Sequence, residues 1–396
     1  MSCDSTSQRE KGESMNFVLG ASEIDGDLLH ELEGHGVQLL NRTKLELYDI
    51  EFFDEDKVYI ASERDLPELM TRTQSLKRKE QIEVLKDKFL FRVLTQNLLP
   101  EFSFEVASRA QELLKKSSNE VFIVKPRKGF FGLGVRRVSR ETLLHCGSSL
   151  LDSLASEVRS KATDSLSSSF SFLSSDANPK GSDSSLADEF ILEECVSGTE
   201  YSVDLYYNSV GKPVILNICC HPEHDLPQFS NALYYSSYSC FEKIYHQAMS
   251  FFVSLGERLN ARSFPIHAEF MLTSGGRFVP IELNPLRFGG FGLSDLPYYA
   301  YGFNPIQAFF DDRIPDWEKI WSSRKDRYYG WVLKYNRQSD LDSYRPDHAG
   351  FKKNFSHVLK YREIDFKTHP VSGVAYVEEK SLQDLLKILK CDFNQF

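Results

Sequence analysis

The sequence has no cysteine pattern that would hold a structural zinc ion or a redox pair. Its seven cysteines are scattered along 396 residues, and none of them forms a CxxC pair. Zinc sites and dithiol motifs require closely spaced ligands, so both classes are excluded. An odd cysteine count in a chain of this size favours a reduced, cytoplasmic protein over a disulfide-bonded secreted one.

Long apolar runs and an excess of positive charge are also missing. No stretch of about 18 consecutive apolar residues is present, so no membrane span is expected. The first residues are polar and lack the apolar core of a signal peptide, which predicts a disordered leader over residues 1–14. The net charge of −10 argues against a general nucleic-acid binder, because no basic field would attract a polyanion.

Strand-like and helix-like segments alternate along the chain, which predicts a mixed α/β (α+β) fold. Residues 15–85 begin with a β-α-β pattern, and one helical pattern covers residues 66–98. Serine dominates residues 147–186, which we interpret as an insertion with a helical first part and a flexible second part. The aromatic segment after "RFGGFG" is expected to be irregular. Residues 311–396 are expected to form a β region and a final short helix.

A Gly-Gly turn predicts a β-hairpin that carries two glutamates. If Gly275 and Gly276 form a two-residue turn, Glu269 lies opposite Glu282, and His267 lies opposite Asn284. All four side chains then share one face of the sheet. Two facing carboxylates repel unless a cation lies between them, and oxygen ligands suit Mg²⁺ or Mn²⁺. The alternative is a strand pair whose glutamates are neutralised by an arginine or a lysine.

Two further segments have a nucleotide-binding interpretation and a plain structural one. The strand "VFIVKP" ends in Lys125 and leads into a basic loop with three glycines, which permits close approach of backbone N–H groups to phosphate. The loop matches neither the Walker A pattern nor the dinucleotide fingerprint, so a surface hairpin is the alternative. The strand "FILEECVSGTEYSVD" offers an apolar slot and a carboxylate for ribose, or is simply a charged edge strand.

The order of these motifs resembles the ATP-grasp superfamily over roughly residues 15–310. In chain order they are "LKDKFLFR", "VKP" with its glycine loop, "ILEECVSGTEYSVD", "HAEF", a glycine turn and "IELNPLRFGG". The resemblance implies an N-terminal α/β domain (15–85), a lid subdomain (86–195) that holds the serine-rich insertion, and a metal-binding subdomain (196–310). Residues 311–396 remain as a C-terminal extension. The "NPLRFGG" form is similar to a subgroup of ATP-grasp ligases.

The resemblance also implies roles for individual residues. Lys88 and Lys125 look like the two lysines that hold the ATP phosphates, and three positions match the metal ligands of the family, namely Glu269, Glu282 and Asn284. Arg287 looks like the catalytic arginine, although Leu286 places it one position later than in the usual Asn-Pro-Arg sequence. The lid glycines, the adenine-reading strand and the ribose carboxylate correspond to Gly129, Gly132, Gly134, Glu193, Glu194, Val196 and Glu200.

What the resemblance implies about function is an ATP- and Mg²⁺-dependent ligase that joins a carboxylate to an amine through an acyl phosphate. A kinase that stops at phosphoryl transfer, and an ATP-binding regulator without turnover, are the alternatives. Candidates for binding the acid or the amine are His221, His267, Arg287 and the Tyr234–Ser239 run. Small-molecule substrates are expected as partners, with no nucleic acid and no membrane, and the oligomeric state stays open, with a homodimer as the candidate.

Overall fold

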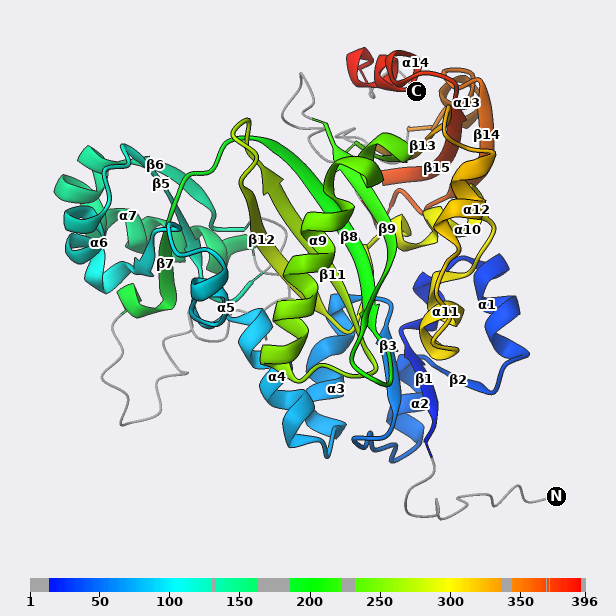
Figure 1. The fold of residues 1–396 in the computed structure, drawn as a ribbon, viewed down its shortest axis with the longest axis horizontal. Coiled ribbons are helices and arrows are strands. Elements are labelled where there is room, and N and C mark those ends of the chain that lie inside the picture. Colours follow the sequence, from blue (N-terminus) through cyan, green and yellow to red (C-terminus); the bar gives the residue numbers. More distant parts are fainter. Residues whose placement is uncertain are drawn as a thin grey trace.

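The computed structural model describes residues 14–129, 133–161, 186–222, 232–335, 344–367, 369 and 371–392. Within these residues the chain forms three sheets, of three, eight and four strands, with helices packed around them (Figure 1). The expected leader and the second part of the serine-rich segment lie almost entirely outside the described residues. The mixed fold expected from the sequence is confirmed.

The three-stranded sheet belongs to the N-terminal part of the chain and is parallel, with strand order β2-β1-β3. Its elements are β1 (Asn16–Leu19), α1 (Gly26–Glu33), β2 (Val37–Leu40), α2 (Arg42–Leu47) and β3 (Lys57–Ile60). The Asp25 side chain accepts a hydrogen bond from the N–H of Asp27 and so begins α1, as N-cap residues do. The β-α-β alternation expected here is therefore present.

Three helices replace the single helical stretch expected over residues 66–98. They are α3 (Leu66–Arg72), α4 (Leu76–Lys86) and α5 (Lys88–Thr95). Ser75 caps α4, and the Asp87 carboxylate accepts from the N–H groups of Phe89 and Leu90 to begin α5. Asp87 ends α4 and begins α5, so the chain turns at this residue. The side chains of Lys86 and Lys88 therefore project from two different helices, on either side of the turn.

The four-stranded sheet is antiparallel, with strand order β4-β7-β5-β6. Its strands are β4 (Phe104–Val106), β5 (Val121–Pro126), β6 (Arg136–Ser139) and β7 (Phe190–Glu194). Helices α6 (Ala110–Lys116) and α7 (Arg140–Lys161) lie beside it, at the left of Figure 1. A separate hydrophobic core that includes Phe122, Leu154 and Val158 holds this part together.

The eight-stranded sheet forms the centre of the molecule, with strand order β12-β11-β8-β9-β10-β13-β15-β14. Its strands are β8 (Thr199–Tyr207), β9 (Pro213–His221), β10 (Leu233–Ser237), β11 (Phe264–Leu272), β12 (Phe278–Pro285), β13 (Tyr328–Tyr335), β14 (His357–Glu363) and β15 (Val371–Glu379). Helix α9 (Tyr238–Leu259) packs against it. The C-terminal strands therefore continue the sheet formed by residues 199–285, and this sheet crosses the boundary expected at residue 310.

The aromatic segment expected to be irregular contains three short helices instead: α10 (Leu296–Tyr301), α11 (Pro305–Phe310) and α12 (Trp317–Ser322). Proline stands in the first turn of α10 and α11, where its missing N–H costs nothing. Each helix has six residues, too few to show a helical period in the sequence. Helices α13 (His348–Lys352) and α14 (Leu382–Leu386) complete the fold. No described helix has the length and apolar character needed to cross a membrane.

Candidate active site

The β11–β12 hairpin has the expected pairing but not the expected turn. Glu269 lies opposite Glu282, and His267 lies opposite Asn284. The N–H of Thr273 donates to the carbonyl of Arg277, so the turn contains three residues rather than two. Ile281 then forms a bulge between the Glu282 and Pro280 pairings, which shifts the register back by one residue. The longer turn and the bulge cancel, and for that reason the two glutamates still face each other.

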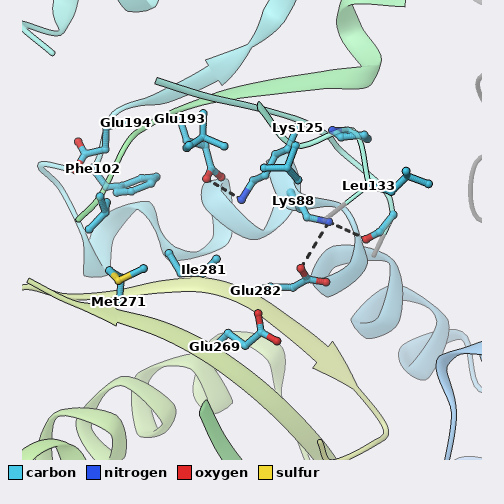
Figure 2. A pocket seen from close by; sticks show the side chains of 15 residues that line it. Lys88, Phe102, Lys125, Leu133, Glu193, Glu194, Glu269, Met271, Ile281 and Glu282 are labelled. Carbon is cyan, nitrogen blue, oxygen red and sulfur yellow. Dashed lines mark hydrogen bonds and ion pairs between the residues drawn. The ribbon is translucent and has the colours of Figure 1, made fainter. Parts of the chain in front are cut away.

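A cavity of about 310 Å³ lies between this hairpin and the four-stranded sheet (Figure 2). It is lined by Lys88, Phe102, Ile123, Lys125, Pro126, Gly129, Leu133, Val135, Glu193, Glu194, Val196, Glu269, Met271, Ile281 and Glu282. Phe102 and Met271 lie toward one end, together with Glu194, whose carboxylate pairs with Arg277, whereas Lys88 and Glu282 lie toward the other. The cavity thus combines an apolar end with a charged end, as a nucleotide requires.

Eight of the predicted site residues line this cavity, namely Lys88, Lys125, Gly129, Glu193, Glu194, Val196, Glu269 and Glu282. Gly132 lies outside the described residues. Gly134 has a packing reason to be glycine: its φ is 75°, and an added Cβ would lie 2.6 Å from Val158 and 2.9 Å from Pro126. Asn284, Glu200 and Arg287 lie beyond the cavity lining.

At the cavity wall, Lys125 and Glu193 form a buried ion pair with Arg92. Lys125 Nζ lies 2.8 Å from Glu193 Oε2, and Arg92 Nε donates to Glu193 Oε1 at 2.7 Å. Burial alone would raise the pKa of Glu193, but the charges of Arg92 and Lys125 outweigh it and lower the pKa to about 2. Burial lowers the pKa of Lys125, and Glu193 partly offsets this effect. The Glu193 carboxylate therefore orients Lys125 at the cavity.

Lys88 reaches the charged end of the cavity from the first position of α5. Its Nζ donates to the carbonyl oxygen of Gly129 at 2.9 Å and lies 4.0 Å from Glu282 Oε2. Arg127, in the basic loop, turns away and pairs with Asp87. Lys88 and Lys125 thus supply the cationic part of the cavity, and the loop arginine instead supports the corner between α4 and α5.

Glu63, Lys86 and Arg287 form a second cluster of charged side chains, next to the metal-ligand candidates. The sequence did not predict this cluster. Glu63 accepts hydrogen bonds from Lys86 and, at 3.1 Å, from Arg287 Nη2. Lys86 Nζ also donates to Asn284 Oδ1 at 3.3 Å and lies 3.9 Å from Glu282 Oε1. Burial would raise the pKa of Glu63, but Lys86 and Arg287 outweigh it and lower the pKa to about 2. Glu63 therefore holds Lys86, which lies beside Glu282 and Asn284, and also holds Arg287.

Leu286, the extra residue before Arg287, is absorbed by a left-handed backbone conformation. Its φ is 62°, an uncommon value for a residue other than glycine. Its N–H donates to the Pro265 carbonyl at 2.7 Å, and its carbonyl accepts from the Ile60 N–H at 2.8 Å. These two bonds hold the strained residue in place. Arg287 consequently points toward Glu63 rather than away from the site.

The charge on Glu63 leads to a pH-dependent prediction for stability. The folded-state pKa of about 2 lies below the ordinary value of 4.5, so the stabilisation is complete above pH 4.5 and is lost as the pH falls toward 2. The difference in unfolding free energy between the wild type and Glu63→Gln should shrink by up to about 3 kcal/mol over this interval. Thermal unfolding at several pH values measures the difference. Glu83→Gln, which changes an exposed glutamate of α4, is the control, and a pH-independent difference for Glu63→Gln would contradict the assignment.

His267 is buried between two carboxylates. Its Nδ1 lies 2.7 Å from Asp204 Oδ1, and its Nε2 lies 3.5 Å from Glu269 Oε1. Burial would lower the pKa of His267, but Asp204 and Glu269 outweigh burial and raise it to about 9. The ring thus acts as a cation between Asp204 and Glu269, so His267 contacts a metal-ligand candidate through its ring rather than facing open solvent.

Glu200, His221 and Tyr234 form a small cluster on the same sheet, next to the cavity. Glu200 lies opposite the cavity-lining Met271. His221 Nδ1 lies 3.0 Å from Glu200 Oε1, and the rings of His221 and Tyr234 stack at 4.2 Å. The structure therefore brings the ribose-carboxylate candidate together with two of the substrate-binding candidates.

The donor set of the hairpin can be compared with the needs of a metal ion. The described residues contain no cluster of three or more His, Cys, Asp or Glu side chains arranged around a common point. Glu269, Glu282 and Asn284 offer two carboxylates and one amide oxygen, which fits Mg²⁺ bound mainly by water and phosphates. The lysines near Glu282 are also what the ion-pair alternative predicts, so the metal site stays a prediction.

This chain is similar to known proteins in the sequence of one domain and in its overall fold. Residues 118–295 match the ATP-grasp domain family. No curated protein matches the sequence. The L-amino acid ligase from Bacillus licheniformis has 14% identity and a TM-score of 0.64, and the alignment covers 96% of this chain and 97% of that one.

Two further solved structures show the same likeness. Biotin carboxylase from Campylobacter jejuni has 12% identity and a TM-score of 0.60, with 95% of this chain and 90% of that chain covered. N5-carboxyaminoimidazole ribonucleotide synthetase from Thermotoga maritima has 15% identity and a TM-score of 0.57, with 96% and 98% covered. The arrangement of sheets around the cavity is therefore the ATP-grasp fold. Residues 118–295 therefore carry a match to the ATP-grasp domain, and the chain has the ATP-grasp fold, in agreement with the sequence resemblance.

Proposed function

We propose that the protein is an ATP-dependent ligase that activates a carboxylate as an acyl phosphate and couples it to an amine. Amino acids or small peptide-like acids are the proposed substrates. The observation that carries the proposal is a single cavity that joins an apolar end to two buried lysines and two facing glutamates. The similar structures include an L-amino acid ligase, a carboxylase and a synthetase, which supports an enzyme of the ligase class.

The residues divide the work between nucleotide binding and charge neutralisation. The apolar end near Phe102 and Met271 would hold the adenine, and Lys88 and Lys125 would bind the phosphates. Glu269, Glu282 and Asn284 would hold Mg²⁺ or Mn²⁺, which when bound neutralises phosphate charge. Glu200 is the proposed ribose ligand. Such a site accelerates transfer mainly by positioning and by fixed charges.

The proposed reaction has two steps. A carboxylate oxygen of the acid attacks the terminal phosphorus of ATP, the bond to the bridging oxygen breaks, and ADP leaves. The amine then attacks the acyl carbon, loses a proton, and phosphate leaves. Arg287, held by Glu63, would stabilise the negative charge on the transferring phosphoryl group.

A screen for ADP release across pairs of carboxylic acids and amines tests this proposal. A ligase forms ADP, phosphate and a new amide, and only when both substrates are present. ADP with a stable phosphorylated product would instead identify a kinase. ATP binding without release of ADP for any pair would identify a non-catalytic regulator.

The same preparations can be used to measure the oligomeric state and test the proposed homodimer. Localising the protein in cells would test the proposed cytoplasmic location.

Lys125→Met is expected to weaken ATP binding by about 10- to 100-fold, because a charge-assisted hydrogen bond contributes about 1.5–3 kcal/mol. Isothermal calorimetry measures the affinity. Lys128→Met, in the same basic segment but exposed, is the matched control and should leave the affinity unchanged. Equal ATP affinity in the Lys125 variant and the wild type would show that this segment does not bind phosphate and is a plain surface hairpin.

A further inference from the structure

One buried carboxylate contacts both the hairpin with the metal-ligand candidates and the loop that follows Arg287. Asp204, on β8, is 3% exposed. Its Oδ1 atom lies 2.7 Å from Nδ1 of His267, which donates to it. The same Oδ1 accepts a second hydrogen bond from the backbone N–H of Gly289 at 2.9 Å. Two donors from different segments therefore converge on one oxygen atom.

The first donor leads to the facing glutamates. His267 is almost fully buried, and its other ring nitrogen, Nε2, lies 3.5 Å from Oε1 of Glu269. A ring held on one side by Asp204 has little freedom to rotate, so it presents Nε2 to Glu269 in a fixed direction. Such contacts behind a ligand orient it and commonly change metal affinity 10- to 100-fold when removed.

The second donor leads to the arginine loop. Gly289 lies two residues after Arg287, and an added Cβ at Gly289 would lie 2.9 Å from Leu293, so this turn is closely packed. The backbone is fixed before Arg287 by the two hydrogen bonds of Leu286. The bond from Gly289 to Asp204 anchors the backbone two residues after Arg287 to the central sheet, and further along the Phe291 and Gly292 carbonyls accept from Trp331 and Tyr376 of the same sheet.

We propose that Asp204 is a positioning residue that fixes Glu269, through His267, and the Arg287 loop, through Gly289, in one mutual arrangement. The inference rests on the proposed function, since it gives Glu269 and Arg287 their roles in binding and transfer. It assigns Asp204 a role in both halves of the site, although Asp204 does not line the cavity. A purely structural carboxylate would affect stability alone.

The test compares three variants with two readouts that need no substrate. The first readout is the Mg²⁺ concentration for half-maximal binding of a non-hydrolysable ATP analogue, measured by calorimetry. The second is hydrogen exchange at the Gly289 amide. His267→Ala should raise the half-saturating Mg²⁺ concentration about 10-fold and leave Gly289 protected. Asp204→Ala should cause the same rise and also accelerate exchange at Gly289 by at least about 10-fold.

Asp204→Asn supplies the conservative variant, because its amide oxygen can still accept from both donors. It should restore most of the protection at Gly289. Asp56→Ala is the matched control: Asp56 is equally buried and accepts from the backbone N–H groups of Met15 and Phe53, but it lies in the N-terminal part of the chain. It should lower stability without changing either readout.

Three outcomes would overturn the inference, and a fourth concerns the proposed function. If Asp204→Ala leaves the Mg²⁺ dependence unchanged, Asp204 does not position Glu269 through His267. If it leaves hydrogen exchange at Gly289 unchanged, Asp204 does not position the Arg287 loop. If Asp56→Ala changes both readouts as much as Asp204→Ala does, the effect of Asp204 is a general loss of stability and Asp204 is a purely structural residue. If the wild-type protein binds the ATP analogue without any dependence on Mg²⁺, the metal site of the proposed function fails instead.

Discussion

Glu282→Gln is expected to lower Mg²⁺-dependent ADP release by at least about 100-fold, since loss of even an indirect metal contact costs 10- to 100-fold. Glu282 lies opposite Glu269 on the hairpin and lines the charged end of the cavity. The amide keeps the shape of the side chain but removes the negative charge that would hold the metal ion. The rate of ADP release, measured over a range of Mg²⁺ concentrations, gives both the loss of rate and any shift in metal dependence.

Glu257→Gln is the matched control for this experiment. Glu257 is an exposed glutamate of α9, so its replacement changes net charge by the same amount without touching the cavity. An unchanged rate in Glu282→Gln would sink the metal assignment. The contacts of Glu282 with Lys86 and Lys88 would then describe an ion pair, as the alternative interpretation of the sequence holds.

Arg92→Met is expected to lower the free energy of unfolding by about 3–5 kcal/mol, the usual cost of removing one partner from a buried ion pair. The Arg92 side chain is 1% exposed. Besides its two bonds to Glu193, Arg92 donates to the Pro280 carbonyl. Methionine fills much of the space but leaves Glu193 with Lys125 as its only cationic partner among the described contacts. Urea unfolding followed by circular dichroism measures the change.

Arg109→Met is the control for Arg92→Met. Arg109 pairs with Glu105 at 3.2 Å but is half exposed, so its loss should change stability by no more than about 1 kcal/mol. A second variant, Arg92→Lys, keeps a positive charge beside Glu193 and should lose less stability than Arg92→Met. Equal stability of Arg92→Met and the wild type would show that the buried pair does not stabilise the fold.

The pairing of Glu269 with Glu282 could be predicted from the sequence, even though the turn that joins their strands was predicted wrongly. Side chains in a strand alternate between two faces, so one shift in register would have moved Glu282 to the opposite face. The turn is one residue longer than predicted, and the bulge at Ile281 restores the register. On β11 the buried Ala268, Phe270 and Leu272 alternate with the half-buried Glu269 and Met271, and this alternation specifies the face that carries Glu269. The turn itself was poorly specified by Gly275 and Gly276.

The residues that sequence reasoning missed share a different property. Arg92 pairs with Glu193, Lys86 contacts Asn284 and Glu63 pairs with Arg287, across 101, 198 and 224 positions of the chain. Even Glu63 and Lys86 are 23 positions apart. No local pattern marks such a pair, because neither residue looks unusual among its own neighbours. Lys86 offered the one usable signal, since it stands two residues before Lys88 with only a helix cap, Asp87, between them.

The continuous central sheet has a consequence for any attempt to express the nucleotide-binding part alone. β13 pairs with β10 over five residue positions, from Leu233–Val332 to Ser237–Tyr328. A fragment that ends at residue 295, where the domain match ends, would leave the outer edge of β10 unpaired, and bare strand edges promote aggregation. The smallest unit expected to fold by itself therefore extends well beyond the ATP-grasp domain and includes the strands near the C-terminus.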